Sequence, residues 1–468
     1  MTSNDVWALP ATDLVGQYRA GRLSPVEVTT AMLERIEALD GDLNAYVTRT
    51  PERALEDARR AEAAYRAGTA GALAGVPIAI KDLTPTRGIR TAFGSLLYES
   101  YVPVEGTPDV ERLEAAGTVM LGKTTTPEFG WKGDSGNRVN GPARNPWNTD
   151  LTPGGSSGGS GAAVAAGLTT LASGSDGAGS IRIPASFCGV YGLKPTTGLI
   201  PRVPSSMSVH SHIGPMTRTV LDAALFMTVA AGDDPRDRNS WSSGIDYYAA
   251  LSGGCDLTGL RVAWSPDLGY AEVDPEVAAV AERAAHTFAA LGCHVEEAQP
   301  RAGDAWPVIE VVFALSQLSR HVDDLDAVRE RLDPGRVELL EHARGFTADD
   351  IMRAHNDWNS YFHVWREFMR DYDVLLTPAM ACKPFAAGAH KPATVNGKPT
   401  TYLGWTGFAY PFNLTGQPAA SMPCGFTPDG LPVGLQVVGR YRDDLTVLRA
   451  SAAFEAASPW PHIATPLA

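Results

Sequence analysis

The chain has 468 residues, of which 44% are hydrophobic and 20% are charged, a mixture that predicts a globular protein and argues against wholesale disorder. Its formal net charge of −14 repels phosphate backbones and acidic membrane surfaces, so nucleic acid is not expected as a partner.

The N-terminal residues MTSNDVWALPATDLVGQY contain no basic segment followed by an apolar stretch, so no signal peptide is expected. No apolar run approaches the ~18 residues that a membrane span requires. The five cysteines are widely spaced and form no CxxC pair, which fits a reducing compartment better than a disulfide framework. These features predict a soluble cytoplasmic protein that needs no membrane.

The first seventy residues have helical patterns. Ser24, Pro25 and Glu27 form a capping box with proline at the first helical position. Apolar residues then follow at helical spacing: Val28, Met32, Leu33, Ile36 and Leu39. A second helix is predicted over 51–67, with Gly68 ending it.

Strand patterns begin with GVPIAIKDL at 75–83 and TVMLGKTTTPEF at 118–129. Further strands are predicted in LRVAWS, CHVEEA, DVLLTPA, PAASMPCG and GLQVVG, with helices at 275–291 and 443–457 among them. This alternation predicts an α/β fold with a central sheet. No repeat or long linker divides residues 1–468, so one domain is expected. Segments 200–212, 304–325 and 380–410 are candidates for long functional loops.

The segment at 153–180, PGGSSGGSGAAVAAGLTTLASGSDGAGS, is rich in glycine and serine but does not have the composition of a linker. Its run GAAVAAGLTTLA has a helical pattern of small residues, which allow backbones to approach closely. Glycine clusters on either side suggest an anion or oxyanion site at a helix start. No lysine follows, which excludes a phosphate loop. The GxSxG pattern at 154–158 lacks the preceding strand that a nucleophile elbow requires.

A longer pattern is more specific. Residues 153–196, ending in SGSDGAGSIRIPASFCGVYGLKPT, resemble the signature region of the amidase signature family of serine hydrolases. The resemblance extends to GVPIAIKDL before it, and after it to GPMTRTVLDAALFM, to NLTGQPAASMPCGFTPDGLPVGLQVVG and to the C-terminal helix. It implies a central mixed sheet covered by helices on both faces. It also implies a helical part at 1–70, a catalytic core at 75–200 and substrate-cleft loops within 200–410.

The resemblance implies a Ser–Ser–Lys triad. Ser180 would be the nucleophile, Ser156 would relay its proton and, as in the family, would follow a cis peptide bond, and Lys81 would be the final base. The residues themselves agree with these roles. A lysine is a base only when neutral, and burial favours the neutral form. Lys81 follows an apolar run and is one of only seven lysines in the chain, although a lysine at a strand end can equally extend to the surface.

The resemblance also assigns an oxyanion hole to the backbone N–H groups that precede and include the nucleophile. These belong to Gly177, Ala178, Gly179 and Ser180. The family more often has a bulkier apolar residue and two glycines before the serine, whereas this chain has Gly-Ala-Gly. The Cβ of Ala178 disfavours a positive φ, which could alter the shape of the hole.

Other residues near the nucleophile are expected to support it. Asp176 and Arg182 bracket the nucleophile turn and are predicted to form a structural ion pair. Ser157 and Ser175 are expected to be hydrogen-bond partners of the triad, with ordinary turn serines as the alternative.

Several further residues could have carried other chemistry. His210 and His212 could share one face of a strand, but without a carboxylate cluster they are weak evidence for a metal, and neither metal nor cofactor is expected. Cys188 is expected to be a buried filler. A set of aromatic residues is expected in the core, with some at a substrate pocket: Trp131, Trp306, Tyr402, Trp405, Phe408 and Tyr410.

Together these features predict a cofactor-independent enzyme that hydrolyses small aryl or alkyl amides, with esters and carbamates (urethanes) as further substrates. Two alternatives remain open: the A subunit of a tRNA-dependent amidotransferase, which releases ammonia from glutamine, and a non-catalytic binding protein on the same scaffold. The sequence is compatible with either a monomer or a homodimer.

Overall fold

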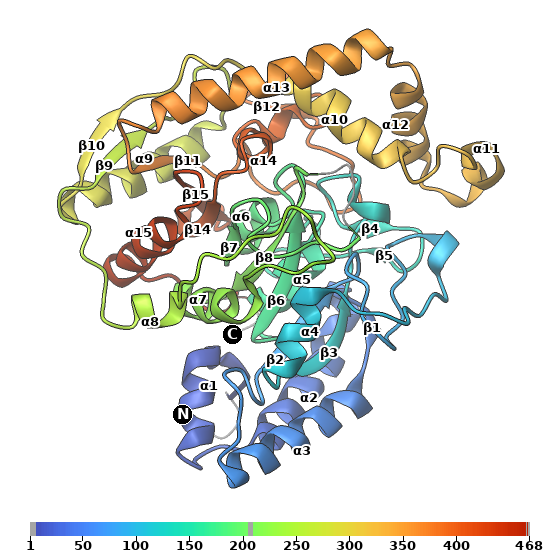
Figure 1. Ribbon diagram of the computed structural model, residues 1–468, viewed down its shortest axis with the longest axis vertical. Helices are drawn as coiled ribbons and strands as arrows, with labels where there is room; N and C mark the ends of the chain where they lie inside the picture. Colours follow the sequence, from blue (N-terminus) through green and yellow to red (C-terminus); the bar gives the residue numbers. More distant parts are fainter. Residues whose placement is uncertain (1–5, 205–208, 465, 467–468) are drawn as a thin grey trace.

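The structure is a computed structural model that describes residues 6–204, 209–464 and 466. A sheet of eleven strands runs through the molecule from β1 at one end to β10 at the other (Figure 1). In spatial order its strands are β1 (Tyr46–Arg49), β3 (Val119–Thr124), β2 (Pro77–Lys81), β6 (Leu171–Asp176), β8 (His212–Thr217), β7 (Tyr191–Lys194), β14 (Ala419–Phe426), β15 (Pro432–Gly439), β11 (Val374–Pro378), β9 (Arg261–Trp264) and β10 (His294–Glu297).

The sheet is mixed, as the family resemblance implied. Strands β3, β2 and β6 are mutually parallel, and so are β11, β9 and β10. The pairs between β6 and β11 are antiparallel, as is the pairing of β1 with β3. Two small hairpins lie outside this sheet: β4 (Gly136–Asn137) with β5 (Gly141–Pro142), and β12 (Thr394–Val395) with β13 (Lys398–Pro399).

Helices cover both faces, because successive strand residues point into different cores. Ile78 and Ile80 of β2 belong to one apolar cluster, whereas Ala79 belongs to another. Helices that contribute to the first cluster are α1 (Ala11–Arg19), α4 (Pro108–Ala115), α7 (Val220–Ala230), α8 (Tyr247–Leu251), α9 (Pro275–Ala290) and α15 (Asp444–Ala457). Helices on the opposite face are α2 (Pro25–Leu43), α3 (Pro51–Ala67), α5 (Gly158–Ala165), α6 (Arg182–Cys188), α10 (Trp306–Leu318), α13 (Ala348–Phe368) and α14 (Tyr410–Leu414).

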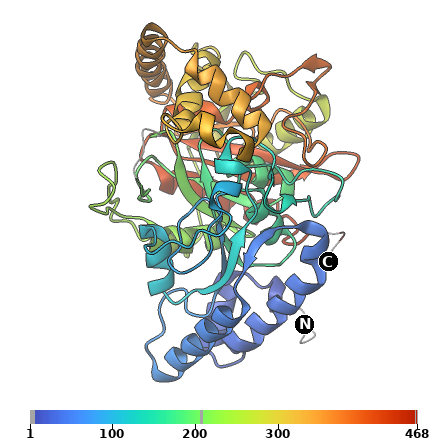
Figure 2. The same cartoon turned by 90° about the vertical axis from the view of Figure 1, so that its right-hand side faces the viewer.

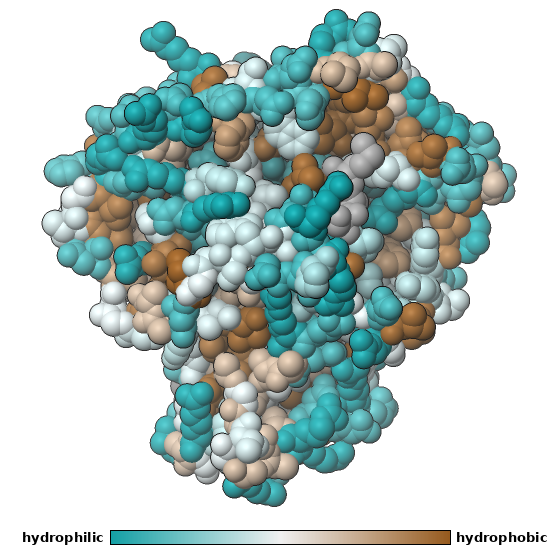
Figure 3. All heavy atoms as spheres, viewed as in Figure 1, coloured by the Kyte–Doolittle hydropathy of each residue, from teal (hydrophilic) through white to brown (hydrophobic). Residues whose placement is uncertain are grey.

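Helices α11 (Leu325–Val328) and α12 (Pro334–Arg344) adjoin α10 and, with α13, form an end of the molecule distant from α1–α3 (Figure 2). Single 3₁₀ turns lie at Val6–Ala8, Leu96–Tyr98, Glu128–Gly130, Arg329–Arg331 and Gly404–Thr406. The face in Figure 3 is largely hydrophilic, with its apolar residues in separate patches. None of the helices in the described residues has the length and apolar character that crossing a membrane requires.

Most of the predicted elements are confirmed. Helix α2 begins after the Ser24 capping box, and α3 ends at Gly68, which has a φ of +71°. The prediction of a loop at 304–325 is wrong, because α10 occupies most of this segment. Packing against α12 and α13 holds α10 in place. Of the loop expected at 200–212, residues 205–208 lie outside the described residues, whereas 380–410 is mostly irregular.

The small-residue run of the Gly/Ser segment is only partly helical. Helix α5 ends at Ala165, and β6 begins at Leu171, so the second half of the expected helix is turn and strand. The close approach expected of this helix is present. A Cβ on Gly159 would lie 2.4 Å from the Thr125 nitrogen.

Candidate active site

Lys81 is the last residue of β2 and its side chain is fully buried. A hydrogen bond of 2.7 Å joins its Nζ to Oγ of Ser156, and two more join it to Oγ (3.0 Å) and the carbonyl oxygen (3.2 Å) of Ser175. Burial lowers the pKa of Lys81 well below its usual value, and Arg202 adds to this shift while Asp176 opposes it. This environment favours the neutral amine.

Ser156 is hydrogen-bonded to Lys81 and lines a cavity that Ser180 also lines. The Gly155–Ser156 peptide bond is cis. A Cβ on Gly155 would lie 2.7 Å from the backbone of Asp134, so only glycine fits before Ser156. Close backbone packing of the glycine segment thus positions the Ser156 hydroxyl against Lys81.

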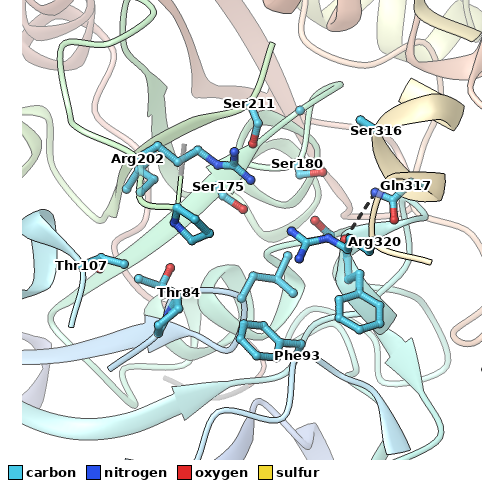
Figure 4. A pocket seen from close by; sticks show the side chains of 18 of the residues that line it. Thr84, Phe93, Thr107, Ser175, Ser180, Arg202, Ser211, Ser316, Gln317 and Arg320 are labelled. Atoms are coloured by element: carbon cyan, nitrogen blue, oxygen red, sulfur yellow. Dashed lines mark hydrogen bonds between the residues drawn. The ribbon is translucent and has the colours of Figure 1, made fainter. Parts of the chain in front are cut away.

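Ser180 lies in the turn between β6 and α6 and faces a cavity of about 320 Å³. Ser156, Ser175 and Gly177 line the same cavity. Figure 4 shows Ser175 and Ser180 side by side at its wall. Of the hydrogen bonds between described residues, none joins Oγ of Ser180 to Oγ of Ser156. Catalytic hydrogen bonds are commonly long without substrate and tighten in the reacting complex.

The turn at 177–180 has the geometry of a donor cluster. Its positive φ, +116°, is at Gly179 and not at Ala178, so the alanine does not strain the turn. The N–H of Gly179 donates to Oδ1 of Asp176 at 2.7 Å, which leaves it unavailable to an oxyanion in this conformation. The N–H groups of Gly177, Ala178 and Ser180 have no acceptor among the described residues and remain candidates for the oxyanion hole.

The start of α5 is not an anion site, contrary to the expectation from its glycines. Its N–H groups already have protein acceptors: Ser157 donates to the Ser180 carbonyl (3.1 Å), Gly158 to Oγ of Ser135 (2.9 Å) and Gly159 to the Thr125 carbonyl (3.1 Å). The first of these bonds ties the helix to the turn that contains Ser180. The free donors precede α6 instead.

Asp176 and Arg182 form the expected ion pair, with Nη2 and Nε of Arg182 at 2.9 and 3.0 Å from the carboxylate oxygens. Burial alone would raise the pKa of Asp176, but the guanidinium keeps it well below its usual value. Asn413 donates to both the carboxylate and the carbonyl of Asp176 at 2.9 Å, and Gln436 accepts from Arg182 at 2.8 Å. Neither Asn413 nor Gln436 was predicted from the sequence. The only sequence feature that could have indicated them is their position in the C-terminal segment that resembles the family.

Ser157 and Ser175 are hydrogen-bonded to each other as well as to the site. The Ser175 N–H donates to Oγ of Ser157 at 3.2 Å, and that hydroxyl lies 3.2 Å from the Ser175 carbonyl. Ser175 contacts Lys81 directly, whereas Ser157 acts through Ser175.

The remaining candidates have separate locations. His210 lines the cavity, whereas His212 in β8 is hydrogen-bonded to Thr197 at 2.8 Å. Among the described residues, no group of three His, Cys, Asp or Glu side chains could hold a metal ion. Cys188 is fully buried. Trp131, Trp306 and Tyr402 line a second cavity of about 290 Å³, and a final group lies in the core: Trp405, Phe408 and Tyr410.

Comparisons with known proteins show which family the chain resembles. A protein-family model described as Amidase matches residues 27–448. The chain is 41% identical to an acylamidase of Rhodococcus erythropolis, over 98% of each chain. It is 38% identical to the A subunit of a glutamyl-tRNA(Gln) amidotransferase of Moorella thermoacetica, over 96% of this chain and 97% of the relative. A solved bacterial aryl acylamidase of the amidase signature family superposes with a TM-score of 0.90, at 31% identity over 98% of each chain.

Proposed function

The chain belongs to the amidase signature family, and we propose that it hydrolyses amides of small molecules through an acyl-enzyme on Ser180. It is a hydrolase of carbon–nitrogen bonds other than peptide bonds. We expect aryl and alkyl amides as substrates. Esters and carbamates present the same carbonyl group with an equal or better leaving group, so they are further candidates.

The observation that carries this proposal is the 2.7 Å hydrogen bond between buried Lys81 and Ser156 at the cavity that Ser180 faces. Neutral Lys81 accepts the Ser156 proton while Ser156 accepts the proton of Ser180. Oγ of Ser180 then attacks the carbonyl carbon, and the free N–H groups of the 177–180 turn stabilise the oxyanion.

The same relay then runs in reverse. The Lys81 ammonium returns a proton through Ser156 to the leaving nitrogen, the carbon–nitrogen bond breaks and the amine departs. Water next attacks the acyl-enzyme and gives a proton through Ser156 to Lys81. The bond between the acyl carbon and Oγ of Ser180 then breaks, and Lys81 returns the proton through Ser156 to Oγ as the acid departs. No metal or cofactor takes part in this proposed sequence.

A panel of anilide, ester and carbamate substrates tests the proposal when each is run with the wild type and with Ser180→Ala. We expect turnover that the substitution abolishes, and labelling of Ser180 by a fluorophosphonate. Anilide hydrolysis by Ser180→Ala at the wild-type rate would overturn the assignment of the nucleophile.

A second candidate function is the glutaminase of an amidotransferase, because several relatives of 34–38% identity carry that name. Glutamine hydrolysis together with co-purification of a partner chain would favour it. Turnover of anilides by the isolated chain, without glutaminase activity, would favour the amidase. If the chain is an amidase, it acts alone as one catalytic unit.

A further inference from the structure

Two arginines extend into the cavity that contains Ser180. Arg202 follows β7 and is half-buried, and Arg320 follows α10 and is exposed. Figure 4 shows their guanidinium groups extending from different walls toward the space beside Ser175 and Ser180. Arg202 lies 22 residues after Ser180 and Arg320 lies 140 residues after it, and the fold brings both charges to the same cavity.

The backbone and the aromatic wall of the cavity position these side chains. The Arg202 N–H donates to Oδ2 of Asp237 at 2.9 Å. The guanidinium of Arg320 lies 5.4 Å from the centre of the Phe129 ring, within the range of a cation–π contact. Gln317, one turn before Arg320, donates to the Phe129 carbonyl at 3.4 Å and ties the helix end to this wall.

The cavity is positively charged, although the chain has a net charge of −14. No aspartate or glutamate is among the described residues that line it. Burial lowers the pKa of His210 to about 3, so this lining histidine is neutral. Burial and the nearby Arg320 charge lower the pKa of Arg202 to about 10, which still leaves it charged at neutral pH, while Asp237 partly compensates from outside the lining.

We propose that the preferred substrate carries a carboxylate, which Arg202 and Arg320 bind while the scissile carbonyl group reaches Ser180. This inference rests on the proposed amidase function and names its substrate class. Guanidinium groups bind carboxylates through paired, charge-assisted hydrogen bonds. Phe93 and Phe129, stacked 6.1 Å apart on the cavity wall, suit an apolar body between the two polar groups of the substrate.

Matched substrates test the charge requirement. For the acyl side, glutaryl p-nitroanilide is compared with pentanoyl p-nitroanilide, which has a methyl group in place of the carboxylate. For the leaving group, the acetyl amide of meta-aminobenzoate is compared with acetanilide. We expect the carboxylate to raise kcat/KM by roughly tenfold or more in one of the two pairs, which identifies the side that faces the arginines. Preference for the neutral substrate in both pairs would overturn the proposal.

Variants test the residues. Arg320→Gln and Arg202→Gln should each lower the ratio of anionic to neutral kcat/KM by about tenfold, mainly through KM, and Arg320→Lys should restore part of it. The control is Arg353→Gln, which removes one charge from an exposed position on α13 and should leave the ratio unchanged. A ratio unchanged in both cavity variants, or lowered equally by Arg353→Gln, would refute the assignment.

Direct binding separates this inference from the proposed function. Glutarate binding to Ser180→Ala can be measured by calorimetry without turnover, and adding Arg320→Gln should weaken it about tenfold. If none of the amides is hydrolysed but glutarate binds in this manner, the proposed function fails and the anion site stands. If the amides are hydrolysed but glutarate does not bind and no pair shows a preference, the anion site fails alone.

Discussion

Lys81 and Lys123 lie on the neighbouring parallel strands β2 and β3, and both are fully buried, yet their surroundings differ. Lys81 is hydrogen-bonded to the hydroxyls of Ser156 and Ser175, both of which line the cavity. Of the bonds between described residues, neither hydroxyl donates its proton elsewhere. Either can therefore donate to Lys81 as well as accept from it.

Lys123 is bonded to the Thr84 carbonyl and to the hydroxyls of Thr86 (2.9 Å) and Thr91 (3.0 Å). These two hydroxyls already donate their protons to backbone carbonyls at 3.1 Å, so they can only accept from the lysine. Three acceptors require all three protons of an ammonium group.

The carboxylates sharpen this difference. Burial lowers the pKa of Lys123 to about 8, and Asp82 is the main group that opposes the shift. Burial raises the pKa of Asp82 to about 6, and Lys123 opposes it in turn. Lys123 is therefore held as a cation by its three acceptors and by the charge of Asp82. Burial alone does not make a lysine a base. It must also have partners that can give it a proton.

The largest expected effect is on activity. Lys81→Met removes the proposed base and should lower kcat/KM for an anilide by about a thousandfold or more. Lys123→Met is the matched control one strand away, and the folded fraction of that variant should keep its activity within about tenfold. Steady-state kinetics corrected for the folded fraction decide between them. Equal losses of kcat/KM in the two variants would show that Lys81 and Lys123 do not differ in function.

The next effect concerns the hydroxyl between base and nucleophile. Ser156→Ala leaves Lys81 neutral but disconnected, so anilide turnover should fall by about a hundredfold or more. Activated esters have better leaving groups and should lose less. Thr86→Val makes the corresponding change at Lys123 and should cost about 1 to 2 kcal/mol of stability with little change in kcat. A loss of the same size for esters and anilides would contradict the relay.

The third prediction concerns stability, for which Lys123 should matter more than Lys81. Lys123→Met leaves Asp82 buried without its cation and three acceptors without a donor, so it should cost about 3 kcal/mol or more of unfolding free energy. Lys81→Met removes an amine that is neutral in the folded chain, and the two serine hydroxyls that contact it line the cavity. We expect its stability at neutral pH to equal or exceed that of the wild type. Denaturant unfolding at pH 7 measures both, and comparable losses would show that Lys81 is also held as a structural cation.

The sequence predicted Lys81 but not the role of Lys123. Local patterns carried the first prediction, since capping residues gave the ends of α2 and α3 and the family motif gave Ser156 and Ser180. Lys123 follows a similar apolar run. Nothing near it in sequence shows that the hydroxyls of its partners already donate their protons to backbone carbonyls. Helix α10 was missed because packing against α12 and α13, not capping, defines it.

Contacts between distant segments were also beyond the sequence. Asn413 and Gln436 are more than two hundred residues from the ion pair that they complete. Arg202 and Arg320 likewise line one cavity only in the folded chain. Such contacts require the strand order, which no local pattern contains.

The smallest expected effect is the pH dependence of the stability difference. An unfolded lysine titrates near ~10.4, whereas burial lowers the pKa of Lys81 well below its usual value. Between these two values the unfolded chain binds one more proton than the folded chain, so wild-type stability rises with pH, by up to ~1.4 kcal/mol per unit. Lys81→Met lacks this titration. Its stability relative to the wild type should therefore be most favourable at low pH and decline as the pH approaches ~10.

Unfolding curves of the two proteins from pH 6 to pH 10, at the same ionic strength, measure this difference directly. Both proteins contain Asp176, whose pKa lies well below this range. Its titration therefore does not contribute to the difference in stability between them. Lys123→Met provides the contrast, because it leaves the three acceptors of Lys123 without a donor and should stay less stable than the wild type at every pH in this range. A difference between wild type and Lys81→Met that does not change with pH would mean that Lys81 is equally protonated in the folded and unfolded chains. It could then not be the base.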